Sequence, residues 1–390
     1  MSEIYLSNPS IVCSAGSDNL VESFADGEVF LSKDSSFLGR EIFVGKCEDL
    51  LPLPQSTALA FKTRTNEILY NAILKLEPLI LELIRCVGKE NIAVSLGTTT
   101  TGIGENYLAI AQSYAKYNAI DFGSIDYVLE RSALSNPAEF LREYFELDSI
   151  HFGLSSACTS GGKAVIQGAR LLKANLCKAV ICGGVDSLNH LTISGFSSLD
   201  ILSSGISKPF TAQRDGINIG EGAGIFLLIA SEVLEDYPQL EPYFKVALLG
   251  YKSNNDAFHI TMPSQDISTE LLSDFSEVDY INLHGTGTIA NDKMEADLIA
   301  LNFPATPASS IKPFIGHTLG AAGGIELGIC AEIILASIEN GTSLLPPHIY
   351  SSDFDNIRLV KKGESKCVKR ALSTSFAFGG DNSAILIGAR

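Results

Sequence analysis

The stretch HFGLSSACTSGGKAVIQGARLL, residues 151–172, determines the fold that we expect for the rest of the chain. It starts as a strand-like segment, passes through a turn of small and polar residues around Cys158, and continues into a helical pattern over 161–174. A thiol at the amino end of a helix faces unpaired N–H groups and the positive end of the helix dipole. Both favour the thiolate, so we expect Cys158 to be a reactive nucleophile rather than a core cysteine.

Apolar segments with the length of buried strands flank this stretch on both sides. They are IAVSLG (92–97), KAVICGG (178–184), GIFLLIA (224–230), YINLHG (280–285) and AILIGA (384–389). Helical patterns at 63–84, 161–174 and 323–338 alternate with them. Strands that are apolar on both faces belong to a covered sheet, so this alternation predicts a layered α/β fold.

A weak internal repeat runs through the chain. Cys158 and His317 each lie in a turn of small residues before a helix, and about sixty residues after each comes a glycine turn that leads into an apolar strand. We therefore expect two similar halves, 1–238 and 239–390, each of which offers one reactive residue at the start of a helix. Such halves would bring the two residues together across a pseudo-twofold axis.

Composition restricts the possible functions. The 390 residues include 45 acidic and 28 basic side chains, for a net charge of −17, which argues against binding nucleic acid or anionic lipid.

No run of 18 apolar residues predicts a membrane span, and the segment from Met1 to Gly16 resembles a first strand rather than a signal peptide. The eight cysteines include no CxxC pair, which predicts a reducing cytoplasmic setting and no structural zinc. GTTTTGIGEN (97–106) lacks the spacing of a nucleotide-binding loop.

The segment LHGTGTIANDKMEA (283–296) ends a predicted strand at His284. A histidine ring can donate a hydrogen bond to an oxyanion that develops during a reaction. Thr286 and Thr288 follow it and could bond to an amide-bearing ligand. Taken alone, the segment fits a solvated histidine in a turn as well as it fits a catalytic histidine.

Two later segments carry further candidates. SSIKPFIGHTLGAAGGIE (309–326) contains Lys312 and His317, and it places Glu326 in an apolar helix where a buried acid needs a partner. FAFGGDN (376–382) is a glycine hinge between aromatic residues. Alone, Lys312 would be read as a surface lysine, and the hinge as an ordinary β-turn.

Together these motifs resemble the β-ketoacyl-acyl carrier protein synthases, the elongating Cys-His-His branch of the thiolase superfamily. The resemblance rests on SSACTSGG, CGGVDS, KPFTAQRDGINIGEGAG, HGTGT, a lysine five residues before the histidine of GHTLGAAG, and FAFGGDN, in that order along the chain. It implies a thiolase-like five-layered αβαβα fold of two pseudo-duplicated halves, which agrees with the internal repeat. It also implies that no metal or bound cofactor takes part.

The resemblance further implies a role for each motif residue. Cys158 would accept an acyl group, and His284 and His317 would hold the malonyl thioester carbonyl while carbon dioxide leaves. The backbone N–H groups of Cys158 and Phe378 would bind the acyl carbonyl oxygen. The supporting and substrate-binding residues would be Lys312 and Glu326 around the histidines, with Thr286, Thr288 and Phe376 along the phosphopantetheine arm.

The implied partners are an acyl carrier protein and a second ketosynthase-like subunit, in a homodimer or a heterodimer. The candidates for docking the acidic carrier are Lys62, Arg64, Lys208 and Arg214. Ala377 and Asp381 depart from the glycine and threonine that are usual in this family, which leaves substrate range and gate motion open. The INIGEGAG block favours a specialised polyene-type enzyme over a housekeeping one.

Three alternatives remain to be weighed. A thiolase needs a second cysteine in a CxG setting, which Cys367 does not supply, and the initiating branch of the family has asparagine where this chain has His317. A non-catalytic chain-length factor typically loses the nucleophile. Because Cys158, both histidines and Lys312 are present, we expect an active condensing enzyme. Acyl-chain length, saturation and the identity of the second subunit stay open.

Overall fold

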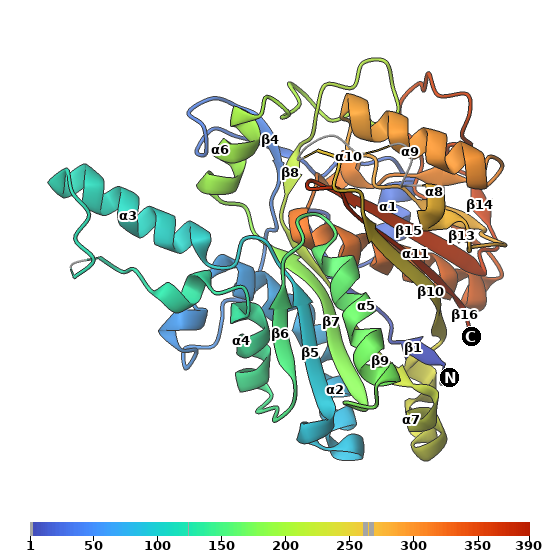
Figure 1. Cartoon of the computed structure of the whole chain (residues 1–390), viewed down its shortest axis with the longest axis horizontal. Helices are drawn as coiled ribbons and strands as arrows, with labels where there is room; N and C mark the ends of the chain where they lie inside the picture. Colours follow the sequence, from blue (N-terminus) through green and yellow to red (C-terminus); the bar gives the residue numbers. More distant parts are fainter. Residues whose placement is uncertain (1–2, 124, 260–263, 265–268) are drawn as a thin grey trace.

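Strands from the first part of the chain form one half of a large mixed sheet (Figure 1). The computed structural model describes residues 3–123, 125–259, 264 and 269–390. The strands of this half lie in the order β1 (Ile4–Leu6), β9 (Gly222–Ala230), β7 (Ala179–Asp186), β5 (Ile92–Gly97) and β6 (His151–Leu154). β9 is antiparallel to both β1 and β7, whereas β7, β5 and β6 run parallel to one another.

The second half repeats this topology strand for strand. Its order is β10 (Val246–Asn255), β16 (Asp381–Ala389), β15 (Arg370–Ala377), β11 (Tyr280–Asn282) and β12 (Ala308–Ser309). β16 is antiparallel to both β10 and β15, and β15, β11 and β12 are parallel. The antiparallel pair β1–β10 joins the halves. The expected duplication is therefore confirmed; the boundary between 238 and 239 falls in the segment that connects β9 to β10 and stays a prediction.

Two helices form a layer between the half-sheets. α5 (Ser160–Lys173) packs on β5 and β7 of the first half and also contacts β16 of the second. α11 (Ala322–Asn340) packs on α5, β9 and β15. The apolar faces of both helices belong to one buried cluster with residues of both half-sheets.

The outer faces of the half-sheets are covered by two further sets of helices. α2 (Arg64–Val87) and α4 (Asn136–Tyr144) cover the first half. α9 (Ile289–Asn302) and the short α8 (Thr269–Leu272) cover the second. The order helix, sheet, helix, sheet, helix confirms the five-layered αβαβα fold.

Shorter elements complete the chain around these layers. They are α1 (Leu20–Ala25), α3 (Ile103–Tyr117), α6 (His190–Ser198), α7 (Ser231–Asp236), α10 (Lys312–Ile315), β2 (Ser10–Val12), β3 (Ser32–Asp34), β4 (Ile42–Gly45), β8 (Ile219–Gly220), β13 (Ser343–Leu344) and β14 (Ser365–Lys366), with short 3₁₀ turns between them. α3 projects away from the body of the protein as an arm (Figure 1).

The predicted helices agree well with those observed, because their ends carry clear signals. α2 begins after Thr63, whose side-chain oxygen accepts the N–H of Asn66 at 3.1 Å as an N-cap, and it ends at Gly88 with φ of +85°. β11 is shorter than predicted, because it ends at Asn282 and leaves His284 in the following loop. The amino-terminal segment forms two short strands, β1 and β2, instead of one.

The helical segment Leu319–Asn340, which includes α11, is long and apolar enough to cross a membrane by length and composition, yet 78% of its most apolar window is buried inside the protein. It approaches α5 very closely. A Cβ atom on Gly161 would lie 2.9 Å from both the Gly320 carbonyl oxygen and the Gly324 nitrogen, and one on Gly323 would lie 2.8 Å from the Gly162 nitrogen. The glycines therefore allow the two backbones to touch, and this contact places the starts of the two central helices side by side.

Candidate active site

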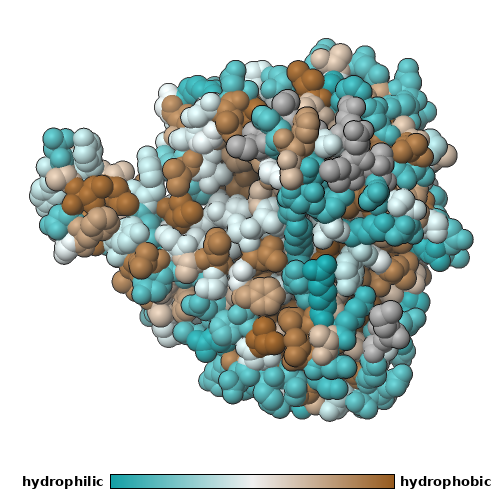
Figure 2. Space-filling view, in the orientation of Figure 1, coloured by the Kyte–Doolittle hydropathy of each residue, from teal (hydrophilic) through white to brown (hydrophobic). Residues whose placement is uncertain are grey.

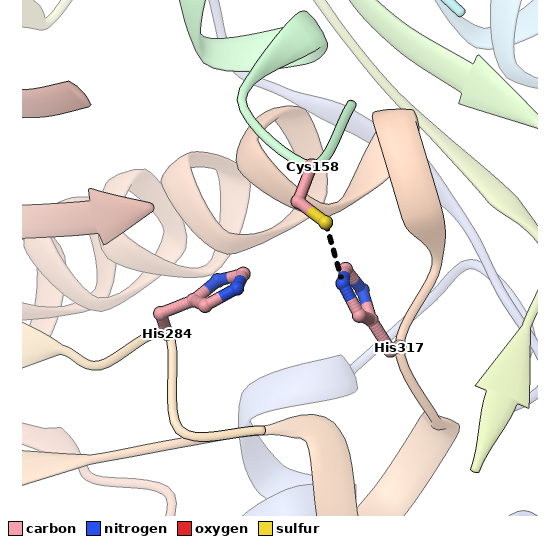
Figure 3. Close-up of side chains that lie close together, drawn as sticks. All are labelled: Cys158, His284 and His317. Carbon is pink, nitrogen blue, oxygen red and sulfur yellow. Dashed lines mark hydrogen bonds between the residues drawn. The ribbon is translucent and has the colours of Figure 1, made fainter. Parts of the chain in front are cut away.

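Cys158, His284 and His317 meet where the starts of the central helices touch (Figure 3). Cys158 lies between β6 and α5, His284 follows β11, and His317 lies between α10 and α11. The Nε2 atom of His317 is 3.0 Å from the Cys158 sulfur, and the two imidazole centroids are 5.3 Å apart at 89°. All three side chains are buried. Residues from both halves thus converge, as the internal repeat predicted.

A strained turn presents the nucleophile. Ala157, directly before Cys158, has φ of +50°, a left-handed conformation that is unfavourable for a residue with a Cβ. The Ser160 hydroxyl supports this turn, because it donates to the Ala157 carbonyl at 2.6 Å and accepts the Ser156 N–H at 2.9 Å. The sulfur is thereby held toward His317.

The INIGEG segment of the first half holds the His317 backbone. The His317 N–H donates to the Asn218 carbonyl at 2.7 Å, and its carbonyl accepts the Gly220 N–H at 2.9 Å. On the ring, Nδ1 accepts the backbone N–H of Leu319 at 3.2 Å. Because Nδ1 is an acceptor, the proton of the neutral ring must lie on Nε2, which faces Cys158.

His284 is fixed in the same tautomer by a different partner. Its Nδ1 lies 3.3 Å from the Lys312 ammonium, which can only donate, so Nε2 again carries the proton. Its loop is held by Glu295 of α9, whose carboxylate accepts the N–H groups of His284 and Gly285 at 2.7 Å each and the Thr374 hydroxyl at 2.8 Å. Burial raises the pKa of Glu295 to about 7.

Glu295 was not identified from the sequence. An acid eleven residues after a histidine matches no known motif. Its contact with the histidine loop becomes apparent only when the position of α9 is known. The signal in the sequence was a carboxylate among the apolar positions of a helix, as for Glu326.

Lys312 and Glu326, which the resemblance placed around the histidines, form an ion pair, and both side chains are almost fully buried, at 3% and 2% exposure. The sequence indicated that Glu326 needs a partner but did not identify Lys312 as that partner. Burial raises the pKa of Glu326 to about 7, against the lowering effect of Lys312. Burial first, and then the positive charge of Lys312, hold the pKa values of His284 and His317 well below their usual range. Both rings are therefore neutral and present Nε2–H donors to the same space.

This arrangement also bears on metal binding. The ligand atoms of Cys158, His284 and His317 all lie within 4.8 Å of one another, so the group could hold an ion by distance alone. A metal ligand must offer a free lone pair, however, and here both Nε2 atoms carry protons because Nδ1 is engaged. The donor set fits the binding of a developing oxyanion better than the binding of a metal.

The Cys158 thiol differs from the sequence-based expectation of a stabilised thiolate. Burial raises its pKa to about 12, and the opposing effects of Lys312 and of the Phe378 backbone N–H do not compensate. Cys158 also precedes α5, which starts at Ser160, so it does not lie inside the first turn of the helix. The site therefore holds a neutral thiol at rest, and its neighbours can stabilise a thiolate once one forms.

This pKa predicts how Cys158 responds to pH. A raised thiol pKa means that the thiolate is a minor species near neutrality and increases about tenfold for each pH unit. Alkylation of Cys158 by iodoacetamide, followed by peptide mass spectrometry, should accelerate about tenfold per unit between roughly pH 7 and 10. The peptide of exposed Cys367 reports reagent activity at each pH. A plateau of the Cys158 rate near neutrality would contradict the raised pKa.

A narrow pocket leads from these residues to the surface. Its apolar side includes Phe196, Phe376 and Phe378, and the rings of Phe196 and Phe378 lie 6.1 Å apart. Its polar side includes Thr286 and Thr288, whose hydroxyls are 3.0 Å apart. All four of the predicted substrate-binding and gate residues thus line the pocket together with the catalytic candidates.

The carrier-docking candidates do not lie together. Lys208 and Arg214 belong to one loop, where Lys208 donates to Gln213 at 3.1 Å and Arg214 reaches the Ile289 carbonyl at 3.4 Å. Ile289 lines a second groove with Thr288 and Phe378, next to the mouth of the pocket. Arg214 therefore lies near the mouth.

Lys62 and Arg64 line a different groove, together with Glu67 and Glu105. Lys62 is exposed. The Arg64 guanidinium is bound to Glu67 and to buried Glu221, at 2.7 Å each. These ion pairs give Arg64 a structural role that the sequence did not indicate, and its assignment to carrier docking stays an untested prediction.

The GTTTTG loop also has a structural role. Threonine backbone and side-chain groups of residues 98–100 donate to Asp186, which is fully buried at the end of β7, at 2.6–2.9 Å. The Gly320 N–H, at the start of the second central helix, donates to the same carboxylate at 2.6 Å. Asp186 of the CGGVDS motif thus ties the two halves together beside the site, a function that the spacing of the motif does not reveal.

Comparison with known proteins agrees with this geometry. The chain matches the family descriptions "Beta-ketoacyl synthase, N-terminal domain" over residues 85–233 and "Beta-ketoacyl synthase, C-terminal domain" over residues 247–341, which together cover more than half of it. It is 32% identical over 254 residues to 3-oxoacyl-[acyl-carrier-protein] synthase 2 of Rhizobium meliloti, an alignment that covers 60% of this chain and 59% of that protein. It is 28% identical over 332 residues to the tetracenomycin polyketide synthase ketoacyl synthase alpha subunit of Streptomyces glaucescens, over 77% and 75% of the two chains.

Among solved structures, a chain in the complex of the ketosynthase ApeO with its chain length factor ApeC from Xenorhabdus doucetiae superposes with a TM-score of 0.86. The two chains are 32% identical, and the alignment covers 100% of this chain and 98% of that one. The family match extends over both halves, and the fold and the three converging side chains agree with it. This chain belongs to the β-ketoacyl synthase family.

Proposed function

We propose that the protein catalyses decarboxylative Claisen condensation of an acyl group, held on Cys158, with malonyl-acyl carrier protein to give a 3-oxoacyl-acyl carrier protein. The observation that carries this proposal is the pair of neutral histidines, each fixed with its Nε2–H toward the space beside a buried thiol. Such a pair donates to an oxyanion and cannot act as a base through the same nitrogen atoms.

The first step is acyl transfer from a carrier thioester. The Cys158 sulfur forms a bond to the acyl carbonyl carbon, and the bond from that carbon to the phosphopantetheine sulfur breaks. The Cys158 thiol gives up its proton as its sulfur bonds to the acyl carbon, and the departing sulfur takes up a proton, so that the carrier leaves with a free thiol. The backbone N–H of Phe378, a residue that lines the same pocket, and that of Cys158 hold the carbonyl oxygen during the transfer.

The second step uses the histidines. Malonyl-carrier enters with its thioester carbonyl oxygen between the two Nε2–H groups, and its carboxylate leaves as carbon dioxide. The electron pair of the broken bond forms an enolate whose oxygen accepts both hydrogen bonds. The enolate carbon then attacks the acyl-cysteine carbonyl carbon, and the bond from this carbonyl carbon to the Cys158 sulfur breaks to release the 3-oxoacyl product. Cys158 leaves as a thiolate and takes up a proton to return to the thiol. No metal or bound cofactor takes part; the phosphopantetheine arm, along Thr286, Thr288 and Phe376, carries both substrates.

Intact mass spectrometry tests this proposal directly. The protein is incubated with acyl-loaded carrier, and malonyl-carrier is added afterwards. We expect an acyl adduct on the wild type that is absent from Cys158→Ala, followed by a carrier product that is two carbons longer and bears a keto group. Varying the acyl group defines the accepted chain length and saturation.

An absent adduct with every acyl carrier would favour the non-catalytic chain-length factor instead, provided that the folded protein still bound the carrier. The structure gives a reason to prefer the enzyme. A subunit that only shapes a partner's tunnel needs neither a strained turn at Ala157 nor a buried Lys312–Glu326 pair behind a histidine. Both features are costly to maintain without a reaction to support.

We also propose that the carrier protein docks near the mouth of the pocket. Arg214 and Lys208 remain the best-placed cations for its acidic surface, because their loop borders the groove next to Phe378. The proposed setting is the cytoplasm, as part of fatty-acid or polyene and polyketide chain elongation. The polyketide synthase relative supports a specialised pathway, whereas the relative named 3-oxoacyl-[acyl-carrier-protein] synthase 2 supports fatty-acid elongation.

A second ketosynthase-like subunit is the other proposed partner. β6 lies at one end of the described sheet, and the α3 arm exposes apolar side chains (Figure 2). The exposed apolar residues of the arm and the segment after it are Tyr107, Leu108, Tyr114, Tyr117, Ile120, Phe122, Leu129 and Leu134. The end of a sheet and a contiguous apolar surface are features that a subunit interface covers.

Light scattering on the chain purified alone distinguishes the two assemblies. Twice the chain mass of 41.7 kDa would indicate a homodimer, and a single chain mass would indicate that a different subunit is required. In either assembly, Phe122→Glu should reduce association, because it places a charge in an apolar contact. Leu301→Glu, on α9, is a matched control, since Leu301 is 67% exposed and Phe122 61%. Equal loss of association in both variants would contradict the assigned surface.

A further inference from the structure

An ion pair connects the β15–β16 hairpin, whose turn contains Phe378, with α5, the helix that follows Cys158. Lys163 of α5 pairs with Asp381, the first residue of β16, and their side chains are only 21% and 13% exposed. The other carboxylate oxygen of Asp381 accepts the hydroxyl of Thr159 at 2.8 Å. Thr159 directly follows Cys158 in the chain. One carboxylate therefore holds two residues on the nucleophile side of the pocket.

The hairpin that Asp381 closes also carries one side of the acyl-binding site. Ala377 and Asp381 are paired across the β15–β16 ladder, and only Phe378, Gly379 and Gly380 lie between them. Phe378 lines the same pocket as Cys158, and its backbone N–H lowers the pKa of the Cys158 thiol. Both glycines have positive φ, +85° and +75°. A turn of this kind offers few side-chain contacts of its own, so its ends determine where the Phe378 N–H points.

The opposite side of the hairpin is held by the last residue of β10 and the residue that follows it. Asn255 donates to the Gly379 carbonyl at 3.1 Å, and the Asp256 N–H donates to the Gly380 carbonyl at 2.8 Å. These contacts fix the turn to the second half of the fold. Lys163 and Thr159, by contrast, fix it to α5 of the first half, the part of the chain that carries Cys158.

We propose that Lys163 and Asp381 are a positioning pair for acyl transfer, which holds the Phe378 N–H at the distance from Cys158 that the acyl carbonyl requires. This rests on the proposed condensing function and deepens it. The pair touches neither His284 nor His317 in the contacts described above, so decarboxylation of malonyl-carrier does not depend on it. The residue that is usual at the position of Asp381 in the family is threonine, which cannot form an ion pair, so the Lys163–Asp381 pair departs from the usual family pattern.

The two half-reactions separate positioning from a general structural role. Single-turnover acylation of Cys158 by acyl-carrier is followed by intact mass. Decarboxylation of malonyl-carrier without an acyl donor is followed by the mass of the acetyl-carrier formed. Lys163→Met and Asp381→Asn should each slow acylation about tenfold, because small displacements of a positioned donor have effects of at least this size. Decarboxylation should stay within about twofold of wild type.

Asp381→Asn keeps an acceptor for Thr159 and removes only the charge. If the two residues act as one unit, the double variant should lose no more than either single variant, about tenfold rather than about a hundredfold. Lys163→Arg keeps the cation and should retain most of the acylation rate. Lys173→Met, on the exposed end of the same helix, removes one charge away from the hairpin and should leave both half-reactions unchanged.

Several outcomes would overturn the inference. They are an unchanged acylation rate in both single variants, an equal loss of acylation and decarboxylation, and multiplying losses in the double variant. Thermal unfolding of each variant shows whether a loss arises from the fold. A wild type that accepts no acyl group from any carrier overturns the proposed function itself, and the control Lys173→Met would then behave like every other variant.

Discussion

Replacing His284 with alanine is expected to slow decarboxylation of malonyl-carrier by about 10²–10³-fold, the usual cost of removing one preorganised oxyanion donor. Its Nε2–H is one of two donors that face the pocket, and Lys312 fixes it in the donor tautomer. Acylation of Cys158 should change little, because the hydrogen-bond partner of the sulfur is His317 and not His284. The two half-reactions, measured by carrier mass and by protein mass, report these effects separately.

The matching substitution His317→Ala should affect both half-reactions. It removes the second oxyanion donor and also the group that lies 3.0 Å from the Cys158 sulfur. A suitable control is His348→Ala, since His348 is a partly buried histidine outside the pocket. If His284→Ala lowered acylation as much as decarboxylation, the assignment of His284 to decarboxylation and of His317 to both half-reactions would be wrong.

Much of this site could be predicted from the sequence, because its residues lie in segments with strong local signals. The helix that follows Cys158 is amphipathic, α2 has a threonine cap at Thr63, and glycines surround His317. The internal repeat correctly placed Cys158 and His317 at the starts of equivalent central helices. The two half-sheets, each of five principal strands, have the same topology, which explains why a weak internal repeat in the sequence was informative.

What the sequence missed depends on contacts between distant segments. Glu295 and Asp186 are ordinary acids in the sequence, and only the fold shows that each binds several N–H or O–H groups in the interior. The state of Cys158 was misjudged for a related reason. The helix dipole can be inferred from local sequence, but burial cannot, and here burial has the larger effect on the thiol.

The docking candidates show the same limit. Arg64 is one of several basic residues in the sequence, and nothing near it indicates that Glu221, more than 150 residues later, binds it. A basic residue can be assigned to a surface only when the positions of the acids are known. Arg214 lies near the pocket mouth because the loop after Lys208 folds back onto Ile289, which again is a tertiary contact.

Glu326→Leu is expected to lower the free energy of unfolding by about 3–5 kcal/mol, since removing one partner leaves the buried Lys312 charge uncompensated. Urea unfolding measures this loss. The double variant Lys312→Met with Glu326→Leu should recover most of the lost stability, because two apolar side chains of similar volume replace a costly buried pair. Lys293→Met, at an exposed pair with Asp297, is the control and should cost less than about 1 kcal/mol.

Activity should not recover in that double variant. Without the Lys312 ammonium, Nδ1 of His284 has lost the donor that keeps the proton on Nε2, so the ring is free to adopt the other tautomer. Decarboxylation should therefore stay low although the protein is again stable. A double variant as unstable as Glu326→Leu would mean that the single substitution acts through lost packing. A stable and fully active one would mean that the tautomer of His284 does not need Lys312, and that the buried pair serves the fold rather than the reaction.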